Sequence, residues 1–463
     1  MKLTFPVWVG ALTYILCAPG PPGHLRAQGQ SPNATNATLK LLYTFKAQGG
    51  TPTALVEVSP GAFLGTTATS PGLFSITSAG AYNFFYTFPP DPEGTGVVGL
   101  TTALNGQTYG AAANSGPVTT FSELFSVAPG GQVTTYPYNA ATQGGAEYLV
   151  QSPDGYLYTF FAQSGNPVPI FARVDYQGNP TSLYTFSASQ GLPYVLLLGK
   201  SADFYGLSLM PSDTGKAGIF RLTPGGSFSW IVPSMPLAGA GSYEVSLIEA
   251  TNGNFYGTQP EGGTANAGTI YQVTRSGAIK TLYEFSNPQT GFPETLLQAS
   301  DGMLYGTARG EYYTGFHGYS SVFRLDPSSG AFQTIFSFKD LSLGECECRM
   351  VQGSDGKLYG ASEDVGTYGG GTIWQLDAGL PPPLPSIGSM VPQAGSVGQK
   401  VLLWGKNLLG ATSVTFNGTS AKHFSVPSSQ GVWAWVPEGA ATGPVTITTP
   451  NGSFTTTASF TVQ

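Results

Sequence analysis

Asp301-Gly302-Met303-Leu304-Tyr305-Gly306 and Asp355-Gly356-Lys357-Leu358-Tyr359-Gly360 are two copies of one phrase, a tight turn followed by an apolar residue, tyrosine and glycine. The phrase returns, complete or degraded, seven times along the chain. We call its tyrosine the anchor position, and the residues that occupy it are Leu64, Tyr109, Tyr158, Tyr205, Tyr256, Tyr305 and Tyr359. A period of about fifty residues, with several short strands in each repeat, is typical of a radial β-repeat.

Each repeat predicts four strands. Apolar pairs such as Leu296-Leu297 lie eight and nine residues before the anchor and predict a first strand. In five repeats an Asn-Gly or Asp-Gly pair follows, which supplies the positive φ angles of a two-residue hairpin. A third strand, such as Val322-Phe323-Arg324-Leu325, and an aromatic fourth strand, such as Leu282-Tyr283-Glu284-Phe285, complete the repeat.

The strand types that begin and end the repeat region predict how its two ends meet. The region begins with a strand of the fourth type, Leu39 to Phe45, and ends with a strand of the third type, Thr372 to Asp377. An open array would leave both ends as unpaired sheet edges, whereas a closed ring lets the N-terminal strand complete the last sheet. We therefore predict an all-β fold with a seven-bladed β-propeller over residues 39–378.

The sequence pattern of the repeat resembles the GloVer tandem repeat of exported bacterial proteins. The resemblance extends over all seven repeats and is most specific in the fifth to the seventh. It is degraded in the first two, where Phe63-Leu64-Gly65 and Thr108-Tyr109-Gly110 replace the full phrase. The resemblance implies a propeller-like exported protein from a bacterium, and it implies no established reaction.

The composition fits this interpretation. Only 9% of the 463 residues are charged, and 64 glycines and 36 prolines indicate many turns and little helix. A net charge of −7 leaves no basic patch for counterion release, which argues against a nucleic-acid partner.

The N-terminus predicts a signal peptide over residues 1–27, followed by a polar linker over residues 28–38. Lys2 precedes the apolar stretch from Phe5 to Ala18, and cleavage after Ala27 is favoured over cleavage after Ala18. The apolar run is shorter than the roughly 20 residues of a membrane-spanning helix. We therefore expect a secreted or cell-surface protein without a membrane span.

The C-terminal part has a different pattern. Residues 379–386 form a proline-rich segment, Pro381-Pro382-Pro383-Leu384-Pro385, which predicts a stiff linker. Residues 387–463 contain short alternating strands with turn signals, as in a β-sandwich. Gly405-x-Asn407-Leu408 and Val414-x-Phe416-Asn417-Gly418 resemble an IPT/TIG domain, an immunoglobulin-like module. Such a resemblance implies a spacer or an adhesion unit.

The longest loop predicted between a second and a third strand contains the best candidates for ligand binding. It lies in the sixth repeat and carries aromatic side chains that can stack on the face of a sugar ring. The candidates are Tyr312, Tyr313, Phe316, His317 and Tyr319. The alternative is a surface loop that packs on itself.

Two glutamates are weaker candidates. Glu147 and Glu294 each lie eleven residues before an anchor, which places both near the mouth of a central channel. Glycoside cleavage needs two carboxylates about 5–10 Å apart, but the third and sixth repeats lie nearly opposite each other in a ring. The alternative is that both glutamates are solvated residues at the start of a strand.

Other chemistry finds little support, and we predict no catalytic triad, no metal site and no cofactor. After signal removal His317 and His423 are the only histidines, and they fall in different predicted domains. Cys346 and Cys348, the only cysteines beyond the signal, are better explained as structural residues than as metal ligands.

Two functions stay open at this point. The first is a non-enzymatic scaffold that binds an extracellular polysaccharide or a surface protein through its loops. The second is a propeller enzyme that acts on carbohydrate, a glycosidase or a polysaccharide lyase. The scarcity of histidine and the resemblance favour the first, although the fold alone does not decide between them.

Overall fold

The computed structural model describes residues 37–46, 50–68, 70–89, 95–114, 122–137, 145–163, 166–210, 215–237, 245–310, 312–313, 316–317, 320–343, 350–362, 366 and 368–463. The prediction of an all-β fold is confirmed, because these residues contain strands and only three short 3-10 helices, Ala188–Gln190 (η1), Pro288–Thr290 (η2) and Leu341–Leu343 (η3). The expected signal peptide, both cysteines beyond it, and Tyr319 lie outside the described residues.

Sheets of four or five strands follow one another along the first part of the chain. The first sheet consists of β2 (Pro52–Ser59), β3 (Ala62–Thr67), β4 (Gly72–Thr77) and β5 (Tyr82–Thr87). The second consists of β6 (Thr95–Thr102), β7 (Thr108–Asn114), β8 (Ser122–Val127) and β9 (Val133–Pro137). The third consists of β10 (Gly145–Gln151), β11 (Leu157–Gln163), β12 (Asn166–Val174) and β13 (Pro180–Thr185).

The next sheets repeat this order. The fourth consists of β14 (Leu192–Pro193), β15 (Leu197–Leu198), β16 (Phe204–Leu209), β17 (Lys216–Leu222) and β18 (Phe228–Pro236). The fifth consists of β19 (Leu247–Glu249), β20 (Phe255–Gln259), β21 (Thr269–Val273) and β22 (Ile279–Glu284). The sixth consists of β23 (Pro293–Gln298), β24 (Leu304–Ala308), β27 (Ser321–Leu325) and β28 (Phe332–Ser337).

The seventh sheet combines the two ends of the repeat region. It consists of β29 (Val351–Gln352), β30 (Leu358–Ser362), β31 (Gly369–Asp377) and β1 (Thr38–Lys46). β1 runs antiparallel to β31, with Leu39 opposite Leu376 and Thr44 opposite Thr372. Because β31 lies between β30 and β1, the N-terminal strand forms one edge of this sheet, opposite the edge formed by β29.

The anchor tyrosines join neighbouring sheets. The ring of Tyr158 lies 4.2 Å from that of Phe204, the residue just before the next anchor, and Tyr205 lies 4.8 Å from Phe255 in the same way. Tyr359 of the seventh sheet lies 4.3 Å from Phe63 of the first sheet. The seventh sheet therefore packs against the first, as well as against the sixth.

A glycine follows most anchors because an aromatic ring covers it. A Cβ atom on Gly306 would lie 2.4 Å from the ring of Phe323 on the neighbouring strand, and one on Gly360 would lie 2.2 Å from Trp374. The same arrangement joins further glycine–ring pairs, Gly65 with Phe74, Gly110 with Phe125, Gly206 with Phe220 and Gly257 with Tyr271. In the third sheet Thr159 takes the position of the glycine, and the residue opposite it is Ala172 where the other sheets have an aromatic ring. The larger residue after the anchor is thus matched by a smaller residue on the neighbouring strand.

Links between sheets also involve polar side chains seven residues before the anchor. Each accepts a hydrogen bond from a backbone N–H group in the first hairpin of the preceding sheet. The acceptor and donor pairs are Glu57 with Ser354 (2.8 Å), Gln151 with Leu104 (3.4 Å), Glu249 with Lys200 (2.9 Å), Gln298 with Thr251 (2.7 Å) and Gln352 with Ser300 (2.9 Å). We call these contacts the inter-sheet latches, and the latch of Glu57 joins the seventh sheet to the first.

The choice between glutamine and glutamate follows from the second partner of each latch. The amide nitrogen of Gln298 donates to the carbonyl of Gly302 in its own hairpin at 2.8 Å. Glu57 instead meets a donor there, because the N–H of Gly61 donates to its carboxylate at 2.7 Å. A carboxylate satisfies two donors, whereas an amide satisfies one donor and one acceptor.

The C-terminal module, residues 386–463, is built from two sheets. One contains β32 (Ser386–Val391), β34 (Lys400–Lys406), β38 (Gly431–Trp435) and β37 (Phe424–Ser425). The other contains β33 (Ala394–Gly395), β40 (Gly452–Val462), β39 (Gly443–Thr449), β35 (Ser413–Phe416) and β36 (Thr419–Ser420). Their inner faces share one apolar core, which includes Val401, Leu403, Val432, Ile447 and Phe460.

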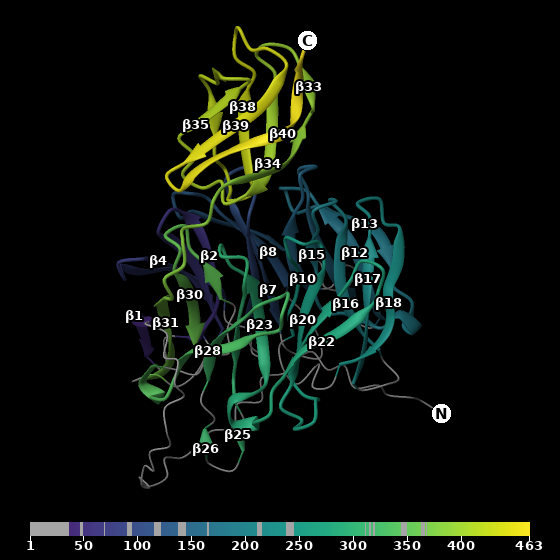
Figure 1. The fold of residues 1–463 in the computed structure, drawn as a ribbon, viewed down its shortest axis with the longest axis vertical. Helices are drawn as coiled ribbons and strands as arrows, with labels where there is room; N and C mark the ends of the chain where they lie inside the picture. The colour runs from purple at the N-terminus through teal and green to yellow at the C-terminus, as the bar shows by residue number, and fades with distance from the viewer. Residues whose placement is uncertain are drawn as a thin grey trace.

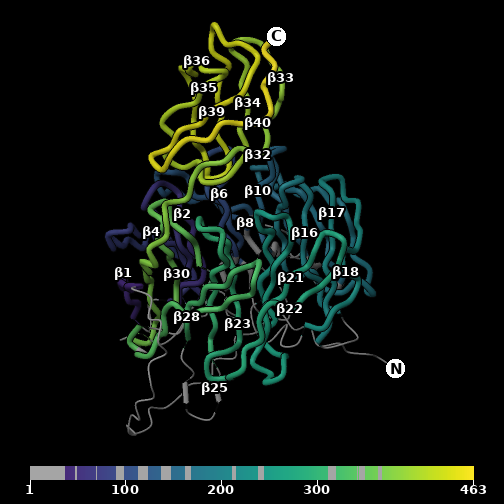
Figure 2. Tube along the Cα trace, in the orientation of Figure 1, coloured from purple at the N-terminus to yellow at the C-terminus, as the bar shows by residue number. Residues whose placement is uncertain are grey.

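The module rests on one end of the repeat region (Figure 1). The indole N–H of Trp433 donates to the carbonyl of Leu104 at 3.0 Å, and the amide of Asn451 donates to the carbonyl of Ser354 at 2.8 Å. The proline-rich linker takes part, since Ser300 donates to the carbonyl of Pro381 at 2.5 Å. Figure 2 shows the same division, with the yellow C-terminal strands gathered beyond the hairpin turns of the sheets.

We expect the Gly306→Ala substitution to lower the free energy of unfolding by about 2 kcal/mol, because the new methyl group would overlap both the backbone oxygen of Thr295 and the ring of Phe323. Urea unfolding followed by tryptophan fluorescence would measure the change. Gly130→Ala is the matched control, since no atom lies within 4 Å of its Cβ position. Equal effects of the two substitutions would contradict the explanation given for the glycine.

The latch of Glu57 should depend on pH. Burial raises the pKa of Glu57 above 4.5, although the hydrogen bonds from Ser354 and Gly61 oppose this shift. A carboxyl group with a raised pKa in the folded state contributes stability that is full below its unfolded pKa and is lost as the pH rises through its folded pKa. The advantage of the wild type over Glu57→Gln in urea unfolding should therefore be larger near pH 4 than near pH 7. An advantage that grows toward neutral pH would show that the pKa is lowered instead.

Candidate functional site

The aromatic candidates lie on a small hairpin of their own. β25 (Tyr312–Tyr313) and β26 (Phe316–His317) pair antiparallel, with Tyr312 opposite His317 and Tyr313 opposite Phe316. The hairpin stands between β24 and β27 of the sixth sheet, at the end of the repeat region away from the C-terminal module (Figure 1). It therefore projects from the end that the module leaves uncovered.

The base of this hairpin is held to the start of the sixth sheet. The N–H of Arg309 donates to the carbonyl of Phe292 at 3.1 Å, and the N–H of Gly310 donates to the carbonyl of Gly291 at 2.9 Å. Phe292 has a φ of 60°, a left-handed conformation that is uncommon for a large side chain. The backbone is thus fixed on both sides where the hairpin leaves the sheet.

The two candidate glutamates differ in what the structure describes. Glu294 lies on β23, is 2% exposed, and places its carboxylate 3.8 Å from the guanidinium of Arg309. The alternative of a solvated Glu294 is therefore wrong, because the residue is buried in the sixth sheet with Arg309 nearby. Glu147 lies on β10 opposite Phe160, and its side chain is outside the described structure.

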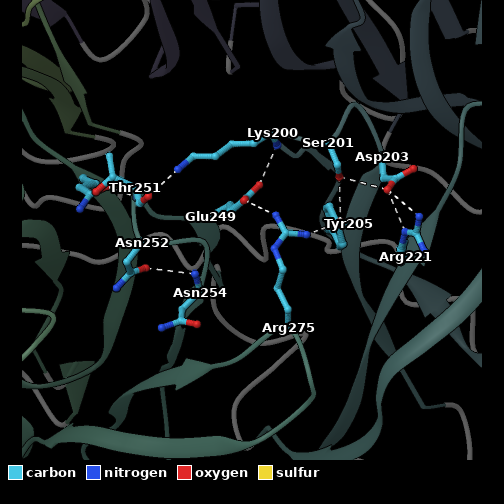
Figure 3. A network of polar contacts seen from close by, with 11 residues as sticks. Lys200, Ser201, Asp203, Tyr205, Arg221, Glu249, Thr251, Asn252, Asn254 and Arg275 are labelled. Carbon is cyan, nitrogen blue, oxygen red and sulfur yellow. Dashed lines mark hydrogen bonds and ion pairs between the residues drawn. The ribbon is translucent and has the colours of Figure 1, made fainter. Parts of the chain in front are cut away.

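A polar cluster that sequence reasoning missed lies between the fourth and fifth sheets (Figure 3). Glu249 is its centre, since its side chain is 4% exposed and accepts from both the backbone of Lys200 and the guanidinium of Arg275. Arg275 also donates to the hydroxyl of Tyr205 at 2.7 Å, and Lys200 donates to the carbonyl of Thr251 at 2.7 Å. The carboxylate lies inside and the cations lie toward the solvent.

The cluster continues along the fourth sheet and carries a surplus of positive charge. Arg221 contacts Asp203 at 2.8 Å, with 45% of the arginine side chain exposed. Burial lowers the pKa of Lys200, and the positive charges of Lys406 and Arg275 lower it further, against the opposing effect of Glu249. Lys406 belongs to the C-terminal module, so the cluster lies near the junction of the module and the repeat region.

The polar residues in the middle of the third strands have a structural role in the last sheets. The amide of Gln375 donates to the hydroxyl of Tyr359 at 2.6 Å, and Gln272 donates to Tyr256 at 2.7 Å. The hydroxyl of Tyr359 in turn donates to Asp355 in its own turn at 2.7 Å. These contacts connect turn, anchor and third strand within one sheet.

The described residues contain no group of three or more histidine, cysteine, aspartate or glutamate side chains that could hold a metal ion. Among them, too, no helix combines the length and the apolar character needed to cross a bilayer.

Residues 192–380 match the Gloeobacter/Verrucomicrobia repeat. This match confirms the resemblance of the repeat for the fourth sheet onward, and no curated protein matches the chain. The segment that matches begins at β14 and ends in the proline-rich linker.

Solved structures with a similar fold have little sequence in common with this chain. A fungal alcohol oxidase of the AA5 family, in complex with copper, is 11% identical and matches with a TM-score of 0.50, over 93% of this chain and all of the oxidase. A protein from Lactobacillus plantarum is 12% identical, with a TM-score of 0.45, over 62% of this chain and 84% of its own. A gluconolactonase from Xanthomonas campestris is 14% identical, with a TM-score of 0.39, over 77% of this chain and all of its own.

The anchor hydroxyls provide a test of the polar contacts. In Tyr359→Phe the amide of Gln375 loses its partner in a buried position, so we expect the free energy of unfolding to fall by about 1–2 kcal/mol. Tyr271→Phe is the matched control, because its hydroxyl is buried without a hydrogen-bond partner among the described residues. Thermal melting that shows a larger loss for Tyr271→Phe than for Tyr359→Phe would contradict the assignment.

Proposed function

We propose that the chain is an exported binding protein, a seven-bladed β-propeller over residues 39–378 joined to an immunoglobulin-like module of the IPT/TIG type over residues 387–463. A signal peptide over residues 1–27, a polar linker over residues 28–38 and a proline-rich linker over residues 379–386 complete the organisation. The pairing of β1 with β31 and the contact of Tyr359 with Phe63 support a closed ring.

The proposed binding face is the end of the ring that carries the β25–β26 hairpin. The observation that supports it is the position of this hairpin, which extends from the sixth sheet at the end opposite the C-terminal module (Figure 1). Two tyrosines, a phenylalanine and a histidine within residues 312–317 offer apolar ring faces together with polar tips, the combination that suits the two faces of a sugar. A polysaccharide or a glycosylated surface protein is the ligand class that fits.

Binding is better supported than cleavage. Glu294 is the buried carboxylate nearest to the hairpin base in sequence, and it lies beside Arg309, which carries the opposite charge. A glycosidase would need this carboxylate to act with a second one across the sugar. The likeness to an alcohol oxidase concerns architecture alone, and it carries no activity over to this chain.

A glycan array probed with the full chain tests the proposal. We expect the double variant Tyr312→Ala, Tyr313→Ala to lose at least about tenfold in affinity for the glycans that the wild type binds, since each lost ring removes a stacking contact. Tyr368→Ala is the control, because Tyr368 is 60% exposed in the corresponding loop of the seventh sheet. Wild-type binding that survives in the double variant would refute the assignment of the hairpin.

A further inference from the structure

The outer face of one sheet in the C-terminal module gathers tryptophan side chains. Across the pairing of β34 with β38, Lys400 lies opposite Trp435, Leu402 opposite Trp433, and Trp404 opposite Gly431. Residues that face each other across antiparallel strands point to the same side of the sheet. The intervening residues Val401, Leu403, Val432 and Ala434 belong to the core of the module, so this other set faces outward.

Only part of this outer face is used to dock the module on the repeat region. Leu402 is 1% exposed, and Leu104 of the second sheet approaches Gly431 so closely that a Cβ atom there would lie 2.2 Å from it. Trp433 contributes its hydrogen bond to the carbonyl of Leu104. Two residues further along β38, Trp435 is half-buried, and Lys400 opposite it is exposed.

The charge of this region is opposite to that of the chain. The module contains three lysines, one glutamate and neither arginine nor aspartate, in a protein whose net charge is −7. The ammonium of Lys400 lies 4.2 Å from the ring centre of Trp433 and 5.2 Å from that of Trp435. Lys406 lies on the same face at the other end of β34. Its positive charge lowers the pKa of Lys200, which belongs to the repeat region.

We propose that this face, which we call the Trp435–Lys400 face, binds an acidic polysaccharide that contains uronic acid residues. An indole ring offers an apolar surface to the C–H face of a pyranose ring, and the adjacent ammonium group pairs with the carboxylate on the same sugar. Lys406, at the other end of β34, is separated from Lys400 by the docked part of the face, so the binding site consists of Trp435 and Lys400. This site is separate from the β25–β26 hairpin and does not depend on the function proposed for it.

Calorimetric titration of the full chain with an oligogalacturonate, and with its methyl ester of equal length, tests the proposal. The wild type should bind the acid more tightly than the ester, and added salt should weaken the binding of the acid. We expect Trp435→Ala to weaken binding of the acid about tenfold and Lys400→Gln about fivefold, with the preference for the acid lost in the latter.

Matched variants keep the result interpretable. Trp435→Phe retains an aromatic ring and should bind more tightly than Trp435→Ala, while Lys280→Gln removes an exposed lysine on β22 and should bind like the wild type. Equal melting temperatures among the variants would show that the module still folds and docks. The proposal is overturned if the wild type fails to bind the acid, binds the ester equally well, or keeps its affinity in both Trp435→Ala and Lys400→Gln. Loss of binding only in Tyr312→Ala, Tyr313→Ala would also overturn it, because the ligand would then belong to the hairpin.

Discussion

The structure depends on one requirement, that each sheet of the repeat region must fit the sheets that pack against it. The anchor tyrosine meets this requirement with a single side chain, because its ring packs against the next sheet while its hydroxyl is hydrogen-bonded, to its own hairpin turn in Tyr359 and to an arginine of the next sheet in Tyr205. The inter-sheet latches add a polar contact in the same direction. Since burial in each sheet depends on its neighbours, neither kind of contact is complete in an isolated repeat.

Much of the fold could be predicted from the sequence because the same pattern of turn and strand residues recurs in repeat after repeat. Asp-Gly turns and alternating apolar residues predict the strands, and the phase of the repeat brings Leu39 near Leu376, where the two strands are paired. The reason for the glycine after the anchor was not visible in one repeat. It becomes clear only when the ring from the neighbouring strand is seen to lie across it, as with Gly306 and Phe323.

The sites were harder to predict, since their partners are far apart in the sequence. Sequence reasoning could name the aromatic loop as a candidate because its residues are contiguous, but it missed the cluster around Glu249, whose partners Lys200 and Arg275 belong to other hairpins. One signal was available. Glu249 stands at the latch position where the next repeat has Gln298, and the exchange marks the place where the second partner is a donating guanidinium, Arg275, and not an accepting carbonyl.

The partnership of β1 with β31 has a consequence for how the molecule is made. Synthesis begins at the N-terminus, so β1 leaves the ribosome long before the strand that it needs at residues 369–377. Until then its free edge is open to wrong pairings, and contacts that span most of a chain form slowly. Completion of the seventh sheet is therefore set by the synthesis of β31, and a nascent chain stalled before that strand would be especially prone to associate with other copies.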